Sequence, residues 1–146
     1  MLGLLQRVTQ ASVTVEGRRV AAIGRGLLVL VGVERNDSET QAGRLVERLR
    51  GYRVFPDEQG RMNLSLADIG GGLLLVPQFT LAADTRKGTR PGFSTAAEPA
   101  RARELFVSLV ECARAAHGEV AAGEFGADMQ VQLINDGPVT FLLEAR

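Results

Sequence analysis

Residues 27–33, Leu-Leu-Val-Leu-Val-Gly-Val, are the longest apolar run in the chain. A run of this length, rich in branched side chains, is typical of a strand buried on both faces of a sheet. It is far too short to span a bilayer. Just before it, residues 12–16 alternate with period two, and a Gly-Arg-Arg turn leads into residues 20–23. That pattern predicts a hairpin packed beside the buried strand.

A helix is expected directly after the buried strand. Ser38 and Gln41 have the spacing of a capping box, in which each residue satisfies a backbone N–H of the other. The apolar positions that follow recur at i, i+3, i+4 and i+7 and form one stripe. They are Ala42, Leu45, Val46 and Leu49. Gly51 is expected to end the helix.

The rest of the chain predicts one more helix and several strands. The helix begins with Pro99 in its first turn and has Gly118 as its expected C-cap. The expected strands are 54–55, 62–66, 73–76, 119–125, 129–134 and 139–144, with a loop over 68–72. Residues 82–97 lack periodicity and read as a long loop, which in a compact domain is often functional. Together these elements predict a single α/β domain over residues 1–146, with a mixed sheet and two covering helices.

The composition excludes several kinds of site. Lys and Arg number 17 and Asp and Glu also number 17, so the formal net charge is +0. A balanced chain does not hold nucleic acid by bulk charge, although a local basic patch can still do so. With one Cys and one His, no internal disulfide and no conventional zinc site are possible, and we predict no metal and no cofactor. The single thiol and the absence of a targeting signal predict a cytoplasmic protein.

The usual catalytic side chains are missing. Cys112 lies on the expected inner face of the second helix and reads as a core residue. His117 lies in the last turn of that helix, where a cation interacts well with the helix dipole. An enzyme with this sequence must therefore act through backbone N–H groups, hydroxyls or the substrate itself.

Two segments stand apart from the scaffold. Residues 76–81, Val-Pro-Gln-Phe-Thr-Leu, lie where a buried strand enters the long loop, and such a strand end can aim backbone N–H groups at one point, as an oxyanion hole does. The residues alone favour a strand that simply ends at Pro77. Residues 135–140, Asn-Asp-Gly-Pro-Val-Thr, join two apolar strands and are consistent with a tight turn. Only about 5–6% of X–Pro bonds in folded proteins are cis, so the residues alone do not choose the isomer.

Taken together, these two segments resemble the D-aminoacyl-tRNA deacylases, also called D-tyrosyl-tRNA deacylases. That family carries a Ser-Gln-Phe-Thr-Leu motif and an Asn-x-Gly-Pro-Val-Thr motif, and here the two motifs are residues 77–81 and 135–140. The likeness extends over the chain, including Gln-Arg-Val at 6–8, Gly-Val at 32–33 and Gly-Glu-Phe-Gly-Ala-Asp-Met at 123–129. It implies a proofreading hydrolase of translation quality control that cleaves the ester of D-aminoacyl-tRNA, and of mischarged glycyl-tRNA, to free amino acid and tRNA.

The resemblance also implies roles for individual residues. The N–H groups of Phe79 and Thr80, beside Gln78, would stabilise the oxyanion in the catalytic site. A cis Gly137–Pro138 loop would enter the site of the partner subunit of a homodimer and exclude L side chains. The other implied contacts are Asn135, Arg7 and Met129 for that loop, and Arg86, Lys87, Arg90 and Phe125 for RNA. The ribose 2′-hydroxyl could activate water where the protein offers no base.

Pro77 departs from the family pattern, which has Ser at this position. A related editing family that removes L-alanine from threonine tRNA has Pro-Gln-Ala-Thr-Leu there, whereas Phe79 and the Gly-Pro segment side with the D-specific family. Deacylation of L-alanine mischarged on threonine tRNA is therefore an alternative function. A non-enzymatic nucleic-acid-binding dimer is a second alternative, against which the zero net charge argues.

Overall fold

The computed structural model describes residues 1–146 and folds them into one mixed sheet, a small two-stranded sheet and two long helices. The strands are β1 (Leu2–Val15), β2 (Arg18–Ile23), β3 (Gly26–Gly32), β4 (Arg53–Pro56), β5 (Met62–Ser65), β6 (Gly72–Pro77), β7 (Val120–Ala122) and β8 (Gln130–Glu144). The helices are α1 (Glu39–Gly51), α2 (Leu66–Ile69), the 3₁₀ turn η1 (Phe79–Ala82) and α3 (Pro99–Ala116). None of these helices is long and apolar enough to cross a membrane.

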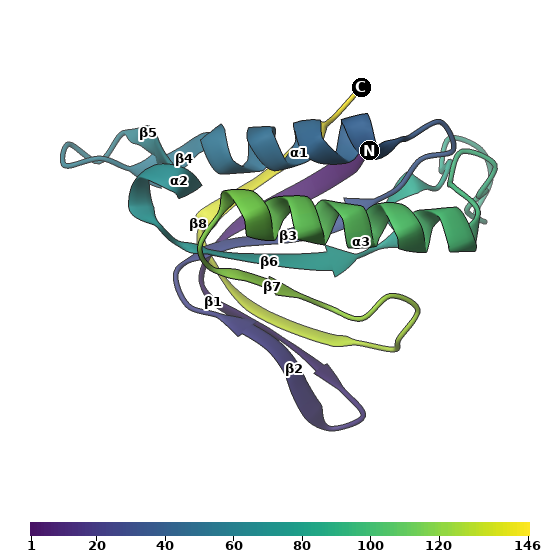
Figure 1. Cartoon of the computed structure of the whole chain (residues 1–146), viewed down its shortest axis with the longest axis horizontal. Coiled ribbons are helices and arrows are strands. Elements are labelled where there is room, and N and C mark those ends of the chain that lie inside the picture. The colour runs from purple at the N-terminus through teal and green to yellow at the C-terminus, as the bar shows by residue number, and fades with distance from the viewer.

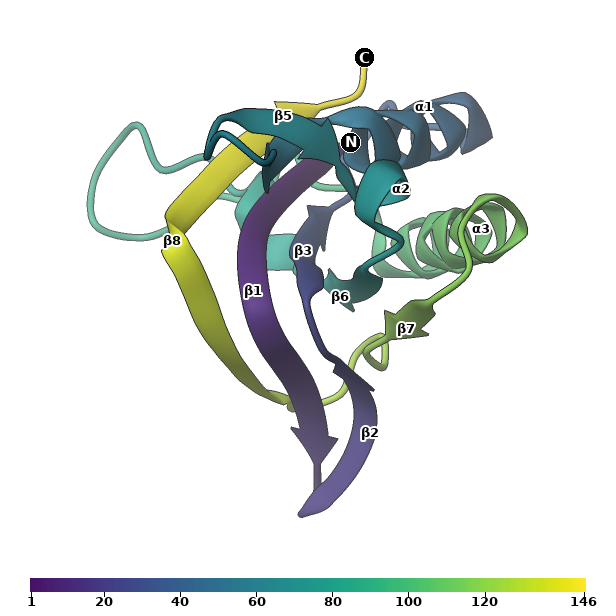
Figure 2. The ribbon, with the colours of Figure 1, turned by 90° about the vertical axis from the view of Figure 1, so that its left-hand side faces the viewer.

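The main sheet is mixed, as the sequence predicts. Its order is β2-β1-β3-β6-β7, with β8 paired to β1. β1 is antiparallel to β2, β3 and β8, while β3 and β6 run parallel, as do β6 and β7. β3 lies at the centre, and Leu27, Leu28 and Val29 have no exposed surface, so the prediction that this run is buried on both faces is confirmed. Figure 2 shows the strands following one another around a curved sheet.

Both long helices cover the same face of the sheet (Figure 1). In α1, the predicted capping box is present and the predicted apolar stripe of four residues is buried. A core of 23 residues fills the space between helices and sheet. A second core of 9 residues, including Val8, Leu28 and Val76, lies where the far halves of β1 and β2 curl over the other face. The sheet is therefore packed on both sides, which fixes the strand ends that carry the site.

Several expected element boundaries are wrong. β1 begins at Leu2 although the sequence pattern assigns no element before residue 12, because its first half gains hydrogen-bonded neighbours on both edges. Residues 66–69 form α2 rather than strand and loop, because Ser65 and Asp68 make a second capping box. The expected strand 119–125 shrinks to β7. α3 ends at His117 as C-cap rather than at Gly118.

The largest correction concerns residues 129–144. The two expected strands and the tight turn between them are one continuous strand, β8, which follows β1 along its whole length. The Gly-Pro segment does not reverse the chain, because both halves of β8 pair with the same neighbour in the same direction. It bulges out of a strand that continues past it.

Candidate active site

The end of β6 becomes the floor of the candidate site. β6 runs parallel to β3, and the N–H of Gln78 still donates to the carbonyl of Val31 at 2.7 Å. Pro77 has no N–H to extend the ladder, and the chain turns directly into η1 at Phe79. The first N–H groups of a helix have no acceptor within it, and neither Phe79 nor Thr80 donates to a carbonyl in the turns and loops. Two adjacent donors are therefore available at this strand end.

A cavity of about 460 Å³ opens beside these residues. Eight of its twelve lining residues are hydrophobic, which suits a site that excludes water around a few polar groups. The lining residues are Val76, Pro77, Gln78, Phe79, Ala97, Pro99, Ala102, Phe125, Gly126, Ala127, Met129 and Val131. Of the predicted site residues, Gln78, Phe79, Phe125 and Met129 line this one cavity.

Thr80 lies at the rim rather than in the lining. Its hydroxyl accepts a hydrogen bond from Nε2 of Gln78. No histidine can act as its base, because Nε2 of His117 contacts the carbonyl oxygen of Gly71 at 2.6 Å, at the opposite end of β6. Six strand residues separate the two ends by roughly 20 Å. Cys112, the only thiol, packs against the main core.

An aromatic pair forms the outer lip of the site. The rings of Phe79 and Phe93 lie 5.3 Å apart, and the two residues are 59% and 42% exposed. Exposed aromatic rings at a cavity mouth are suited to stacking against a base or a ring-bearing side chain. No sequence pattern predicts a role for Phe93, because it lies in an aperiodic loop. A lone Phe among Gly, Pro, Ser and Arg residues was the only signal available.

The predicted basic loop is ordered by its own contacts. Asp84 and Gly92 exchange two backbone hydrogen bonds of 2.7 and 2.9 Å, which close the loop between them. The Arg86 guanidinium donates two hydrogen bonds to Asp84 and holds the pKa of that carboxyl well below its ordinary value of 3.8. Lys87 and Arg90 are exposed and form no salt bridge. Of the three predicted cations, only these two keep an uncompensated charge.

The Gly-Pro segment forms a bulge in β8. Gln6 pairs with Thr140 and Val8 pairs with Asn135, so residues 136–139 lie opposite Arg7 alone. The Gly137–Pro138 bond is cis, and Gly137 has a φ of 144°, which favours glycine. Asn135 closes the base of the bulge: its Oδ1 accepts from the N–H of Val139 at 2.8 Å, and its Nδ2 donates to Oγ1 of Thr140 at 3.0 Å.

The predicted residues of the cavity and those of the Gly-Pro segment are not brought together within one chain. Arg7 contacts the bulge, but Met129 lines the cavity and packs under Gly123, where an added Cβ would lie 2.9 Å from its Sδ. Met129 and Gly137 are separated by eight residues of nearly extended strand, roughly 25 Å. None of residues 135–138 lines the cavity of its own chain. A single chain therefore carries a cavity and a separate bulge.

Comparisons with known proteins agree over nearly the whole chain. Residues 4–144 match the family model described as D-Tyr-tRNA(Tyr) deacylase. A protein of Alkalilimnicola ehrlichii named D-aminoacyl-tRNA deacylase is 65% identical over 146 residues, which cover 100% of this chain and 97% of the relative. A protein of the same name from Methylococcus capsulatus is 64% identical over 143 residues, covering 98% of this chain and 94% of the relative.

Solved structures are also similar to this chain over nearly its whole length. One described as c-Myc DNA Unwinding Element Binding Protein superposes with a TM-score of 0.95 at 40% identity, covering 100% of this chain and 99% of that chain. A second, described as a probable eukaryotic D-amino acid tRNA deacylase, has a TM-score of 0.85 at 18% identity, covers 98% of each chain and shares the fold. The family-model match and the relatives together show that this chain belongs to the D-Tyr-tRNA(Tyr) deacylase family.

Proposed function

We propose that the chain is an aminoacyl-tRNA editing hydrolase that cleaves the ester of D-aminoacyl-tRNA, and of mischarged glycyl-tRNA, in the cytoplasm. The observation that carries the proposal is the strand end at Pro77, where two free backbone donors, those of Phe79 and Thr80, adjoin a largely apolar cavity of about 460 Å³. Relatives at about 65% identity bear the deacylase name. That degree of likeness supports the same reaction here.

The chemistry needs little from side chains. Backbone N–H groups aimed at the ester carbonyl stabilise the negative charge that develops on its oxygen when water attacks, and they need no reorganisation to do so. Thr80, which accepts a hydrogen bond from Gln78, has no adjacent general base, so its role is to hold Gln78 and the turn in position. The vicinal 2′-hydroxyl of the ribose supplies the polar group that activates water. It also distinguishes RNA from DNA at the site.

Selection of the D-enantiomer is assigned to the bulge of a second copy in a homodimer. Within one chain the bulge lies far from the cavity, while Met129 in the cavity wall has no partner from its own bulge. In a two-fold dimer where one bulge enters the partner's cavity, the second bulge enters the first subunit's cavity as well, since isologous contacts are reciprocal. Its carbonyl groups would then crowd the direction of an L side chain and leave D-amino acids and glycine free to bind.

Two alternatives follow from particular observations. Pro77 matches the motif of the editing family for L-alanine on threonine tRNA, although Phe79 does not. The solved structure with the TM-score of 0.95 is described as a protein that binds a DNA unwinding element, which favours a nucleic-acid-binding role. The formal net charge of +0 gives that second alternative little electrostatic support.

One experiment separates all three functions. Purified protein is incubated with D-tyrosyl-tRNA, L-tyrosyl-tRNA, glycyl-tRNA and L-alanyl-tRNA carrying the threonine anticodon, and release of amino acid is followed. We expect rapid hydrolysis of the D-tyrosyl and glycyl esters and none of the L-tyrosyl ester. Preferential hydrolysis of the L-alanyl ester would establish the first alternative. Salt-sensitive binding of uncharged nucleic acid without turnover of any ester would establish the second.

A further inference from the structure

A second groove adjoins the cavity and shares one wall with it. It has a volume of about 300 Å³ and lies between α3 and the end of β7, with Phe125 lining both spaces. Its lining includes Val107, which is 49% exposed and gives the groove an apolar surface that solvent reaches. None of the roles described above uses this groove.

The groove is marked by two unpaired cations. Arg103 and Arg114 line it, are exposed, and form no salt bridge, whereas Arg101 on the same helix is bound by Glu39 and Glu104. Eleven helical residues place the two cations roughly 16 Å apart along one face. One carboxylate, that of Glu111, also lines the groove between them.

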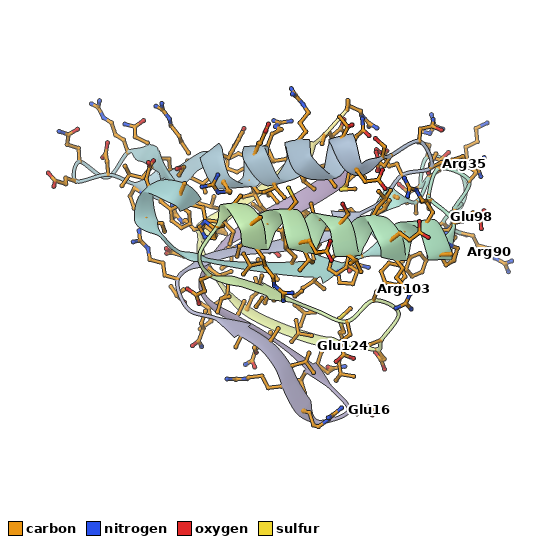
Figure 3. All side chains as sticks on the ribbon, viewed as in Figure 1. Glu16, Arg35, Arg90, Glu98, Arg103 and Glu124 are labelled. Atoms are coloured by element: carbon orange, nitrogen blue, oxygen red, sulfur yellow. The ribbon has the colours of Figure 1, made fainter.

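Arg103 stands where the two spaces meet. Its guanidinium carbon lies 5.0 Å from the centroid of the Phe125 ring, a cation–π arrangement, yet Arg103 is absent from the cavity lining. Figure 3 shows Arg103 between α3 and the loop that carries Glu124. An extended ligand that leaves the cavity past Phe125 would reach Arg103 first and Arg114 last.

We propose that this groove binds the single-stranded nucleotides that precede the terminal adenosine of the tRNA. This inference rests on the proposed function, because it needs an adenosine ester in the cavity. The guanidinium groups of Arg103 and Arg114 bind successive phosphates, for which their planar forks are suited. Val107 and the rim of Phe125 supply an apolar surface for a base between them, the combination of charge and stacking that binds single strands. An RNA strand is favoured over an acidic peptide because the groove continues directly from the cavity that would hold its last nucleotide.

The test compares two substrates that differ only in the RNA beyond the ester. They are D-tyrosyl-tRNA and the D-tyrosyl ester of adenosine. The quantity measured is the KM for D-tyrosyl-tRNA divided by the KM for the D-tyrosyl ester of adenosine. Arg114→Gln removes the cation that is remote from Phe125. We expect it to raise that ratio about fivefold at low salt and to flatten the dependence of log KM on log salt by about 0.7, the loss of one single-strand phosphate contact. Arg44→Gln, an equal loss of charge at an exposed position on α1, is the matched control.

A second variant tests the sign of the effect. Glu111→Gln removes the carboxylate between the two cations, so it should lower the KM ratio where Arg114→Gln raises it. A wild-type protein that hydrolyses neither ester would overturn the proposed function and this inference with it. An active wild type whose ratio is the same in Arg114→Gln and Arg44→Gln would overturn this inference alone. A ratio that responds instead to Lys87→Gln and Arg90→Gln would place the RNA along the long loop and not in the groove.

Discussion

The Nε of Arg7 donates a hydrogen bond of 2.9 Å to the backbone carbonyl of Asp136, 129 residues further along the chain. Its Nη1 donates a second bond, of 2.6 Å, to the carbonyl of Val54 in β4. The Arg7 side chain is only 11% exposed, so both bonds form largely away from water. One guanidinium thus joins β1, the bulge of β8 and the small sheet.

Replacing Arg7 should therefore cost both stability and selectivity. Arg7→Met keeps an unbranched apolar stem but removes the guanidinium and leaves two backbone carbonyls without their donor, and hydrogen bonds to charged groups contribute about 1.5–3 kcal/mol each. We expect the free energy of unfolding, measured in urea, to fall by about 3 kcal/mol, and hydrolysis of L-tyrosyl-tRNA to rise relative to D-tyrosyl-tRNA. Arg18→Met, at an exposed position on β2, should change stability by less than about 0.5 kcal/mol. Equal effects of the two variants would contradict the bracing role.

Adding one methyl group to Gly137 should disable the bulge. A Cβ there would lie 2.7 Å from Cγ2 and 2.9 Å from the backbone nitrogen of Val139, and the φ of 144° is unfavourable for other residues. Gly137→Ala should lower kcat/KM for D-tyrosyl-tRNA about 100-fold, the cost of a misplacement near 1 Å. Pro138→Ala should be milder if the loop keeps its path. Gly43→Ala, in open space on α1, is the control and should stabilise the helix by about 0.5–1 kcal/mol.

Loss of the Thr80 hydroxyl should leave most of the catalysis intact. Thr80→Ala keeps both backbone N–H groups and removes only the acceptor for Gln78, so we expect kcat to fall less than about tenfold. Single-turnover measurements with D-tyrosyl-tRNA check this. A fall of about 10⁴-fold, as for loss of a catalytic triad member, would show that the hydroxyl is a nucleophile or base.

Sites shared between subunits can be tested by mixing two inactive variants. Gly137→Ala spoils the bulge and Ala127→Phe fills the cavity, so each homodimer should be inactive. If each bulge acts in the partner's cavity, about half of the dimers in a random mixture are heterodimers, and each heterodimer has one intact site of two. The mixture should then show roughly a quarter of wild-type activity. If bulge and cavity act within one chain, or if sedimentation gives the mass of a monomer, the mixture stays inactive and the dimer proposal is wrong.

Local sequence rules predict the elements whose signals are also local. The run at 27–33 became the central strand β3, and the Ser38–Gln41 box with its apolar stripe became α1. Two separate strands were expected at 129–134 and 139–144, whereas pairing with β1 keeps β8 one strand on both sides of the Gly-Pro segment. The residue that braces the bulge is Arg7, more than a hundred residues away in the chain. No window of neighbouring residues contains that information.

In the candidate site, too, local sequence signals predict some features, and contacts between distant segments determine the others. The motif at 77–81 located the strand end, and the availability of the two N–H groups follows from Pro77 and the turn after it. The opposite walls of the cavity come from Ala102 on α3 and Val131 on β8, and the lip comes from Phe93. Each of these reads as an ordinary apolar residue in its own segment, and only the packing of α3 and β8 brings them to one place.

The bulge in β8 also bears on the tendency of this protein to aggregate through its sheet edge. β8 pairs only with β1, so its other side is an edge with unpaired backbone groups, and a long regular edge is a template on which further strands can add. Residues 136–139 interrupt that edge near its middle and leave two short pieces out of register with each other. Shortening the bulge until β8 is regular would restore one uninterrupted edge of the full strand length. Aggregation, measured as light scattering of the folded protein on storage, should then increase even where the cavity is untouched.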